Sequence, residues 1–326
     1  MALYIKGMGN ISPQQTWNAK SLSNDVERAS ADRFGAIEPD YAQLIDPKNI
    51  RRMSRIIKLG VGAATIALRQ AEVAVPDAIL TGTGYGCLED TGTFLSKMIE
   101  NREEALNPTP FIQSTHNTIG SQIALLLQCQ GYNQTYAHGA FSFESALLDA
   151  LIQSHEDIER NILIGGVDEI TNASHSIQQR FGMFRKTVNG EGAAFFVVNG
   201  QREKSIACID SVSTWYKPRL NDVVTYLNGV ETKCDLVLLG IGEEDDTDNL
   251  KQTCSELFPA TAYFKHVSGE SPVASSFGVW LAATILQTQV VPDPVLLAGT
   301  TATIRNILVL NRYFGTHYAA ISLSAC

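Results

Sequence analysis

The chain has 326 residues, 44% hydrophobic content, near-zero mean hydropathy and a formal net charge of -9, which indicates a globular protein with a sizeable core. The acidic balance argues against nucleic acid and anionic membrane surfaces as partners. No apolar run approaches the roughly 20 residues that a membrane-spanning helix needs. The cysteines lack paired spacing and zinc-type clustering with histidine, so we expect free thiols in a reducing cytoplasm, no metal and no cofactor.

Hydrophobic periodicity predicts alternating strands and helices in the first part of the chain. Strands are expected near 3–8, 78–83, 133–138, 161–166 and 193–199, and helices near 51–72, 88–100, 117–128 and 142–155. The run from Asn161 to Gly166 is apolar on both faces, which is typical of a central strand covered by helices on each side. Segments 101–116 and 172–192 are rich in turn-forming residues and are expected to be long, functional connections.

A similar alternation follows in the second part. Strands are expected near 205–213, 234–240, 260–266, 294–299, 306–311 and 318–324, and helices near 248–257 and 273–288. Segments 77–84 and 235–242 share an aspartate, an apolar strand and two glycines, and they lie about half the chain apart. This repetition predicts an internal duplication, and therefore a layered α/β fold built from two similar halves.

The segment from Thr135 to Ala150 predicts a strand, a tight turn and an amphipathic helix. Such a turn sets one side chain over a helix N-terminus, where amides and the macrodipole stabilise a thiolate or an oxyanion. Acyl-transfer enzymes place their nucleophile there. The residue at this position is Ala140, which has no functional group.

Neighbouring side chains suggest a hydrolase as an alternative. His138, Ser142 and Glu144 surround Ala140 in sequence. However, His138 is expected within the strand, and Ser142 is more simply a helix N-cap, with Glu144 in the first helical turn where negative charge is favoured. His116 could line a pocket or cap the following helix, and capping is favoured. Phe141 is expected to pack at a subunit interface or pocket wall.

Four further motifs carry a family resemblance. They are Gly131-Tyr132-Asn133, Gly165-Gly166-Val167-Asp168-Glu169, Gly190-Glu191-Gly192-Ala193 and the run from Asn311 to Ala320, which contains Phe314 and Gly315. In this order they resemble the β-ketoacyl synthase branch of the thiolase-like fold. The resemblance implies a layered αβαβα architecture with an N-terminal ketosynthase-like half at 1–200 and a shortened C-terminal half at 201–326. Thr316 departs from the second glycine usual in the last motif.

The resemblance also locates the catalytic positions. Active members use a cysteine that attacks an acyl thioester and two histidines that promote decarboxylation of the malonyl unit. These positions fall on Ala140, Leu239 and Glu270, while Lys265 and Gly269 of the second histidine motif are retained. Glu270 is expected to pair with Lys265 or an arginine rather than to act as a base. Three independent changes indicate that the loss of the catalytic groups is native.

The resemblance implies a chain-length-factor-like subunit that pairs with an active ketosynthase in fatty acid, polyketide or polyene biosynthesis. The strand around 133–139 would form the dimer interface, with an exposed apolar patch around 107–146. The acidic acyl carrier protein would dock through the partner. Two alternatives stay open: an acyltransferase, decarboxylase or thioester hydrolase using Glu270 or His138, and a homodimeric acyl-binding protein.

Overall fold

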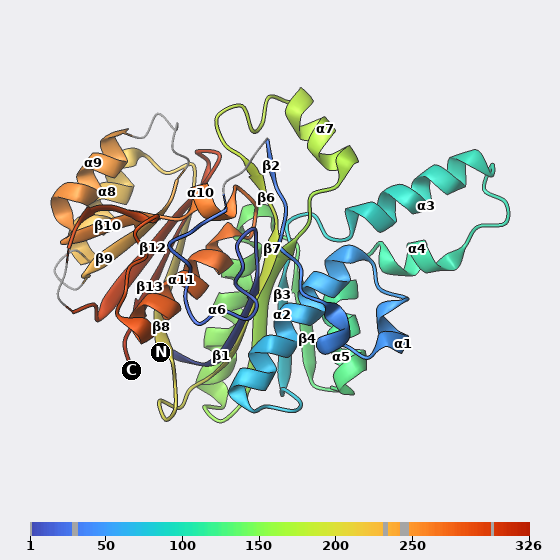
Figure 1. Cartoon of the computed structure of the whole chain (residues 1–326), viewed down its shortest axis with the longest axis horizontal. Helices are drawn as coiled ribbons and strands as arrows, with labels where there is room; N and C mark the ends of the chain where they lie inside the picture. The colour runs from blue at the N-terminus through green and yellow to red at the C-terminus, as the bar shows by residue number, and fades with distance from the viewer. Residues whose placement is uncertain (1, 28–31, 231–233, 242–247, 301–302) are drawn as a thin grey trace.

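A computed structural model describes residues 2–27, 32–230, 234–241, 248–300 and 303–326 (Figure 1). The first half contributes the strands β1 (Leu3–Ile11), β3 (Ala78–Gly82), β4 (Tyr132–Tyr136), β5 (Ile162–Asp168) and β7 (Gly192–Asn199). The second contributes β8 (Ala207–Tyr216), β9 (Leu236–Gly240), β10 (Ala260–Tyr263), β11 (Leu296–Gly299), β12 (Asn306–Tyr313) and β13 (His317–Ser324). The short strands β2 (Arg33–Phe34) and β6 (Asn189–Gly190) pair separately.

The described helices alternate with these strands. In the first half they are α1 (Pro47–Ile50), α2 (Arg55–Ala71), α3 (Leu88–Glu100), α4 (Pro108–Gln113), α5 (Thr118–Leu127), α6 (Ser142–Glu156) and α7 (Asn172–Arg180). In the second they are α8 (Leu220–Val230), α9 (Asp248–Leu257), α10 (Lys265–Ser268) and α11 (Ala274–Thr288). Short 3-10 turns occupy Tyr41–Gln43 and Gly139–Phe141.

The strand order confirms the predicted duplication. The sheet runs β11-β10-β9-β12-β13-β8-β1-β7-β5-β3-β4. The order β4-β3-β5-β7-β1 in the first half is repeated by β10-β9-β12-β13-β8 in the second, with the same parallel and antiparallel pairs. Antiparallel pairing of β1 with β8 joins the halves, and β11 is an added edge strand. The division at residue 200 stays a prediction.

The repeated aspartates have the same role in both halves. Asp77 accepts a hydrogen bond from Asn161 N at 2.8 Å, just before β5. Asp235 accepts one from Asn306 N at 2.9 Å, where β12 begins. Each carboxylate therefore fixes the start of the neighbouring parallel strand, which gives the sequence repeat a physical cause.

Three apolar clusters define five layers, with helices on both outer faces and in the centre (Figure 1). Helices α2 and α5 cover one outer face, and α8 and α9 cover the other. Helices α6 and α11 form the central layer, between the two parts of the large sheet that the two halves of the chain contribute. Phe143, Phe196 and Val279 are fully buried in this layer. The thiolase-like αβαβα architecture is confirmed.

Several expected boundaries were wrong. The strand expected at 133–138 ends at Tyr136, and the one expected at 260–266 ends at Tyr263, since Lys265–Ser268 forms a helical turn. The expected connections 101–116 and 172–192 contain α4 and α7. Helix α8 was not predicted, because its Val, Thr, Asn and Gly residues have weak helix propensity and packing against α9 and the sheet stabilises it instead.

Glu144, whose carboxyl group was expected to be negatively charged, is buried in the central layer. Glu144 is fully buried on α6, and both of its carboxyl oxygens lack a hydrogen-bond partner, as does the neighbouring hydroxyl of Ser275 on α11. Burial raises the pKa of Glu144 from 4.5 to about 7, although Ser275 and Lys265 oppose this effect. The expectation that charge is favoured here was therefore wrong, because desolvation outweighs the helix terminus.

Close contact between β1 and α2 gives a first test. A Cβ at Gly9 would lie 2.2 Å from the carbonyl oxygen of Ala63, whereas one at Gly92 on α3 would meet nothing within 4 Å. We expect Gly9→Ala to lower the free energy of unfolding by about 1–3 kcal/mol. The matched Gly92→Ala control should raise it by about 0.5–1 kcal/mol. Urea denaturation measures both, and an unaffected Gly9→Ala variant would contradict this packing.

Glu144 makes stability depend on pH. Because its pKa is raised from 4.5 to about 7, its contribution is complete below pH 4.5 and is lost as pH rises through about 7. Relative to Glu144→Gln, the natural protein should lose about 2–3 kcal/mol between about pH 5 and about pH 9. Denaturation across this range measures the difference. The control Glu156→Gln, at the exposed end of α6, should follow the natural profile.

Candidate functional site

The turn between β4 and α6 places Ala140 at the N-terminal end of a central helix. Ala140 lies in the 3-10 turn Gly139–Phe141 and is 3% exposed. Gly139 has a φ of +55°, a left-handed conformation that glycine adopts at low cost. The turn geometry expected for a nucleophile is therefore present, and the side chain at its centre is a methyl group.

Ser142 closes this turn instead of capping the helix. Its buried Oγ accepts a hydrogen bond from His138 N at 2.9 Å and lies 2.7 Å from Gly139 O and 3.0 Å from Thr83 O. The N-cap expectation was wrong because the 3-10 turn puts Ser142 inside the helix and makes Phe141 the flanking residue. The Ser142 hydroxyl is thus engaged with backbone groups.

The His138 side chain is exposed rather than directed into the sheet. His138 follows β4, since that strand ends at Tyr136, so its expected place within the strand was wrong. Its Nδ1 lies 3.1 Å from Ser145 Oγ, and its ring lies 5.8 Å from that of Phe141. The structure therefore pairs the His138 imidazole with Ser145, a residue that the sequence did not single out, whereas Ser142 contacts His138 only through the His138 backbone.

Phe141 links this turn to the second half of the chain. Its ring lies 4.7 Å from His317 in an edge-to-face arrangement, and His317 lies 5.0 Å from Tyr216. The pairing of β8 with β13 puts Tyr216 opposite His317. His317 was missed at the sequence level because only this strand pairing brings it to Phe141.

Glu270 forms a buried ion pair. Lys265 Nζ donates to both Glu270 carboxylate oxygens at 2.7 Å and to Arg312 O at 2.6 Å, and both paired side chains are 2% exposed. The Glu270 backbone also bonds to Val188 and Gly190. The expected pair of Glu270 with Lys265 is present in the structure. A carboxylate held by an ammonium group is poorly placed to accept a proton.

The Leu239 side chain faces the outer layer, away from the Ala140 turn, on the part of the large sheet that the second half of the chain forms. Its side chain belongs to the cluster beneath α8 and α9, whereas Leu238 faces the central layer. The next residue, Gly240, has little space, since a Cβ there would lie 2.4 Å from Asn311 Oδ1. The structure therefore does not bring the Leu239 side chain to the central layer.

The loop between β12 and β13 is a tight turn. Tyr313 pairs with His317, and Phe314 and Gly315 have φ values of 43° and 70°. The Phe314 ring lies 5.2 Å from Phe184, which also has a positive φ, of 58°. Tyr313 OH lies 2.8 Å from Tyr85 OH, and burial raises the pKa of both hydroxyls.

His116 does not cap α5. The flanking residue of that helix is Asn117, which makes no side-chain capping bond. The exposed His116 ring instead packs over Gly86, where an added Cβ would lie 2.8 Å from His116 Cδ2. The capping expectation was therefore wrong, because Gly86 leaves room for the ring over the loop after β3.

The acidic motif residues are structural anchors. Asp168 accepts hydrogen bonds from Thr83 Oγ1 and the amides of Gly84 and Tyr85, at 2.9 to 3.1 Å, and burial raises its pKa to about 6. Glu191 binds Arg55 through both oxygens and accepts from two backbone amides. The Asp168 bonds hold the loop after β3, where Thr83 O accepts a hydrogen bond from Ser142 Oγ beside the Ala140 turn.

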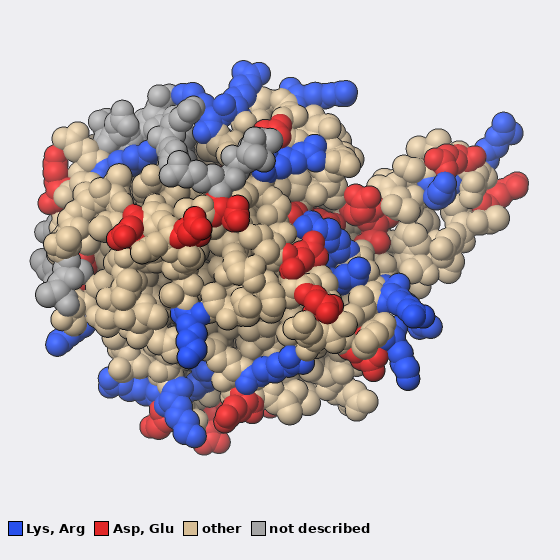
Figure 2. All heavy atoms as spheres, viewed as in Figure 1, with Lys and Arg blue, Asp and Glu red and all other residues tan. Residues whose placement is uncertain are grey.

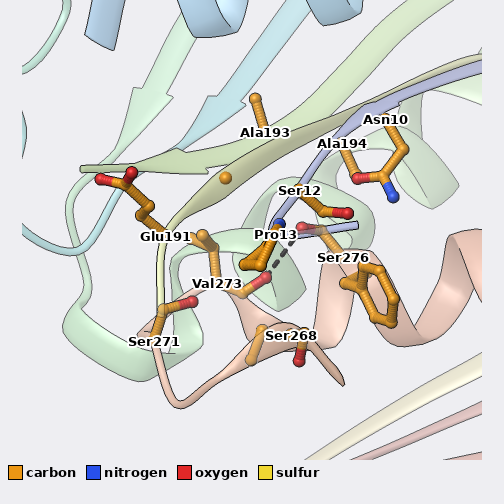
Figure 3. A pocket seen from close by; sticks show the side chains of 13 residues that line it. Asn10, Ser12, Pro13, Glu191, Ala193, Ala194, Ser268, Ser271, Val273 and Ser276 are labelled. Carbon is orange, nitrogen blue, oxygen red and sulfur yellow. Dashed lines mark hydrogen bonds between the residues drawn. The ribbon is translucent and has the colours of Figure 1, made fainter. Parts of the chain in front are cut away.

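A small cavity lies between β1, β7 and the segment leading into α11 (Figure 3). Its polar walls include Asn10, Ser12, Ser271 and Ser276, and its volume is about 20 Å³. Ser276 Oγ donates to Val273 O at 2.7 Å, and Asn10 Nδ2 is buried without a protein partner. This space suits about one water molecule and is too small for an acyl chain.

Metal-binding side-chain clusters and membrane-spanning helices are both lacking among the described residues. Within them, no group of three or more His, Cys, Asp or Glu side chains could hold a metal ion. None of the helices described there has the length and apolar character needed to cross a membrane.

Comparison with solved structures shows the same fold. A chain of the AntDE:AntF complex, a type II PKS acyl-carrier protein in complex with its ketosynthase bound to the hexaketide, has a TM-score of 0.78 at 13% identity, covering 100% of this chain and 99% of the other. The ishigamide ketosynthase/chain length factor gives 0.76 at 16%, with the same coverage. The ApeO ketosynthase with its chain length factor ApeC from Xenorhabdus doucetiae gives 0.71 at 11%, covering 100% and 98%.

No curated protein shows a significant sequence match to the chain. The family model for the β-ketoacyl synthase N-terminal domain matches residues 17–187, which is more than half of the chain. The chain therefore belongs to the β-ketoacyl synthase family.

Proposed function

We propose that this protein is a non-catalytic, chain-length-factor-like subunit that pairs with an active ketosynthase in polyketide, polyene or fatty acid biosynthesis in the cytoplasm. The observation that carries the proposal is Ala140. The backbone turn that positions a nucleophile is kept, but its side chain has no thiol or hydroxyl. A subunit that shapes a neighbouring tunnel needs no reactive atom at this position.

The other two proposed catalytic positions lead to the same conclusion. We assign them to Leu239 and Glu270, although the Leu239 side chain faces the outer layer. Segment 234–241, which contains β9, has no histidine, and Glu270 is engaged by Lys265. Neither residue supplies the neutral imidazole that polarises a thioester carbonyl in active members.

An exposed apolar surface supports pairing with another subunit. Helices α3 and α4 project from the body as an arm, and their described residues include none that is fully buried (Figure 1). Ile99, Phe111 and Ile112 on this arm are 76%, 56% and 63% exposed, and Leu125 on α5 is 69% exposed. Strand β4 is the edge of the sheet, with one side unpaired. Such edges and apolar patches favour association.

We further propose that the acyl carrier protein docks through the partner. The chain carries a net charge of -9, and acidic and basic side chains are interspersed on the face seen in Figure 2. An acidic carrier gains little electrostatic attraction from such a surface. The similar AntDE:AntF structure is a complex of an acyl-carrier protein with its ketosynthase, which fits an assembly in which the active subunit receives the carrier.

The Lys265–Glu270 pair allows a test of its structural role. Glu270→Ala would leave a buried ammonium group, so we expect the free energy of unfolding to fall by about 3–5 kcal/mol. The double variant Lys265→Met with Glu270→Leu should recover much of this loss. Glu100→Ala, which breaks the exposed Lys97–Glu100 pair, should change stability by less than about 1 kcal/mol. A Glu270→Ala variant of natural stability would contradict the structural role.

Pairing is tested by co-expression with a ketosynthase encoded beside this chain that retains its cysteine and both histidines. We expect the two to co-purify, and Ile112→Asp on the arm to reduce recovery of the complex at least about tenfold. The matched control Phe181→Asp changes a phenylalanine that is 82% exposed beyond the end of α7, and should leave recovery unchanged. Failure to co-purify, together with a tight homodimer, would favour the homodimeric acyl-binding alternative.

A further inference from the structure

Three basic side chains from separate segments come together beside the Ala140 turn. His138 follows β4, Lys217 follows β8 and His317 begins β13. The β8–β13 ladder and a 2.6 Å hydrogen bond from Lys217 N to Thr316 O fix the last two segments together. The Phe141 ring, which neighbours Ala140, contacts both imidazoles. The cluster is therefore built by tertiary structure from both halves of the chain.

Each imidazole is oriented through one nitrogen. His138 Nδ1 lies 3.1 Å from Ser145 Oγ, and His317 Nδ1 lies 2.8 Å from Thr316 Oγ1. Either atom of each pair can be the donor, and an imidazole that is protonated on both nitrogens carries a proton on Nε2. Neither Nε2 atom has a hydrogen-bond partner within the described part of the chain, so each can donate to a ligand when its ring is protonated there.

The surroundings of His317 carry positive charge. The pKa of His317 is held below its ordinary value mainly by burial, and also by the nearby charges of His138 and Lys217. Arg312 also approaches this loop, since a Cβ at Gly315 would lie 2.6 Å from its Nη2 atom. Like charges that are held together by the fold repel one another, and a bound anion relieves this repulsion.

The backbone of Lys217 has a less common conformation. Lys217 has a φ of 48°, which is left-handed and unusual for a lysine. Its ammonium group lies over the Tyr216 ring at 5.1 Å, and Tyr216 is itself 62% exposed. Such conformations persist where the surrounding structure imposes them, and they are common at ligand sites.

We propose that His138, His317 and Lys217 form a binding site for an anionic oxygen group, a carboxylate or a phosphate, whose attached apolar part lies against Phe141 and Tyr216. The two Nε2–H groups and the ammonium group would donate to the anion, and the rings would cover the adjoining carbon chain. The site would bind without forming a covalent bond, because Ala140 beside it cannot react. This inference concerns the isolated chain and does not depend on its pairing with a ketosynthase.

The test is an NMR titration of the full chain labelled at its histidines, with malonate and inorganic phosphate in separate arms at constant ionic strength. We expect a saturable change in the His138 and His317 signals and a rise of the His317 pKa by about one pH unit when an anion binds. His155, exposed in the last turn of α6, is the internal control and should not respond. Tighter binding of malonate identifies a carboxylate ligand, and tighter binding of phosphate identifies a phosphate-bearing one.

Two variants separate binding from folding. Lys217→Gln and His138→Gln change exposed side chains, so thermal unfolding should match the natural protein, while the dissociation constant of the preferred anion should rise about tenfold in each. Lys204→Gln, a lysine that also has a positive φ but lies outside the cluster, should leave binding unchanged. Equal responses of His155 and His317, or no saturable response to either anion, would overturn the proposal.

Discussion

The antiparallel pairing of β1 with β8 is the contact on which the rest of the structure depends. It joins two sheets of the same strand order, so that α6 from one half and α11 from the other share one interior. The first turns of these helices then lie together, as the proximity of Glu144 to Ser275 shows. The position of the Ala140 turn is therefore fixed by how the halves associate, independently of any reactive group.

The interior around this turn keeps its polar groups for structural purposes. Lys265 and Glu270 neutralise each other, Asp168 and Glu191 hold backbone amides, and Ser142 closes the turn. Leaving any of these groups unpaired in the interior would cost stability, so each has a structural reason to be present.

Much of the fold could be predicted from the sequence because its signals are local or repeated. The Asp77 and Asp235 segments predicted two equivalent halves, and the apolar run before Asp168 predicted a central strand. The site was less predictable. A single 3-10 turn moved Ser142 from N-cap to turn closure, and the contact between Phe141 and His317 arises only when the two halves pair. Helix α8 was missed because tertiary packing, not propensity, stabilises it.

The central claim is that this member of the β-ketoacyl synthase family has kept the architecture of the site and lost its chemistry. The most direct measurement is intact-protein mass spectrometry of the purified chain, offered acyl and malonyl carrier-protein thioesters, with carbon dioxide release followed in the same reaction. We expect no acyl adduct and no carbon dioxide above the protein-free rate. A stoichiometric adduct, or turnover that is abolished by Glu270→Ala in a folded protein, would contradict the claim.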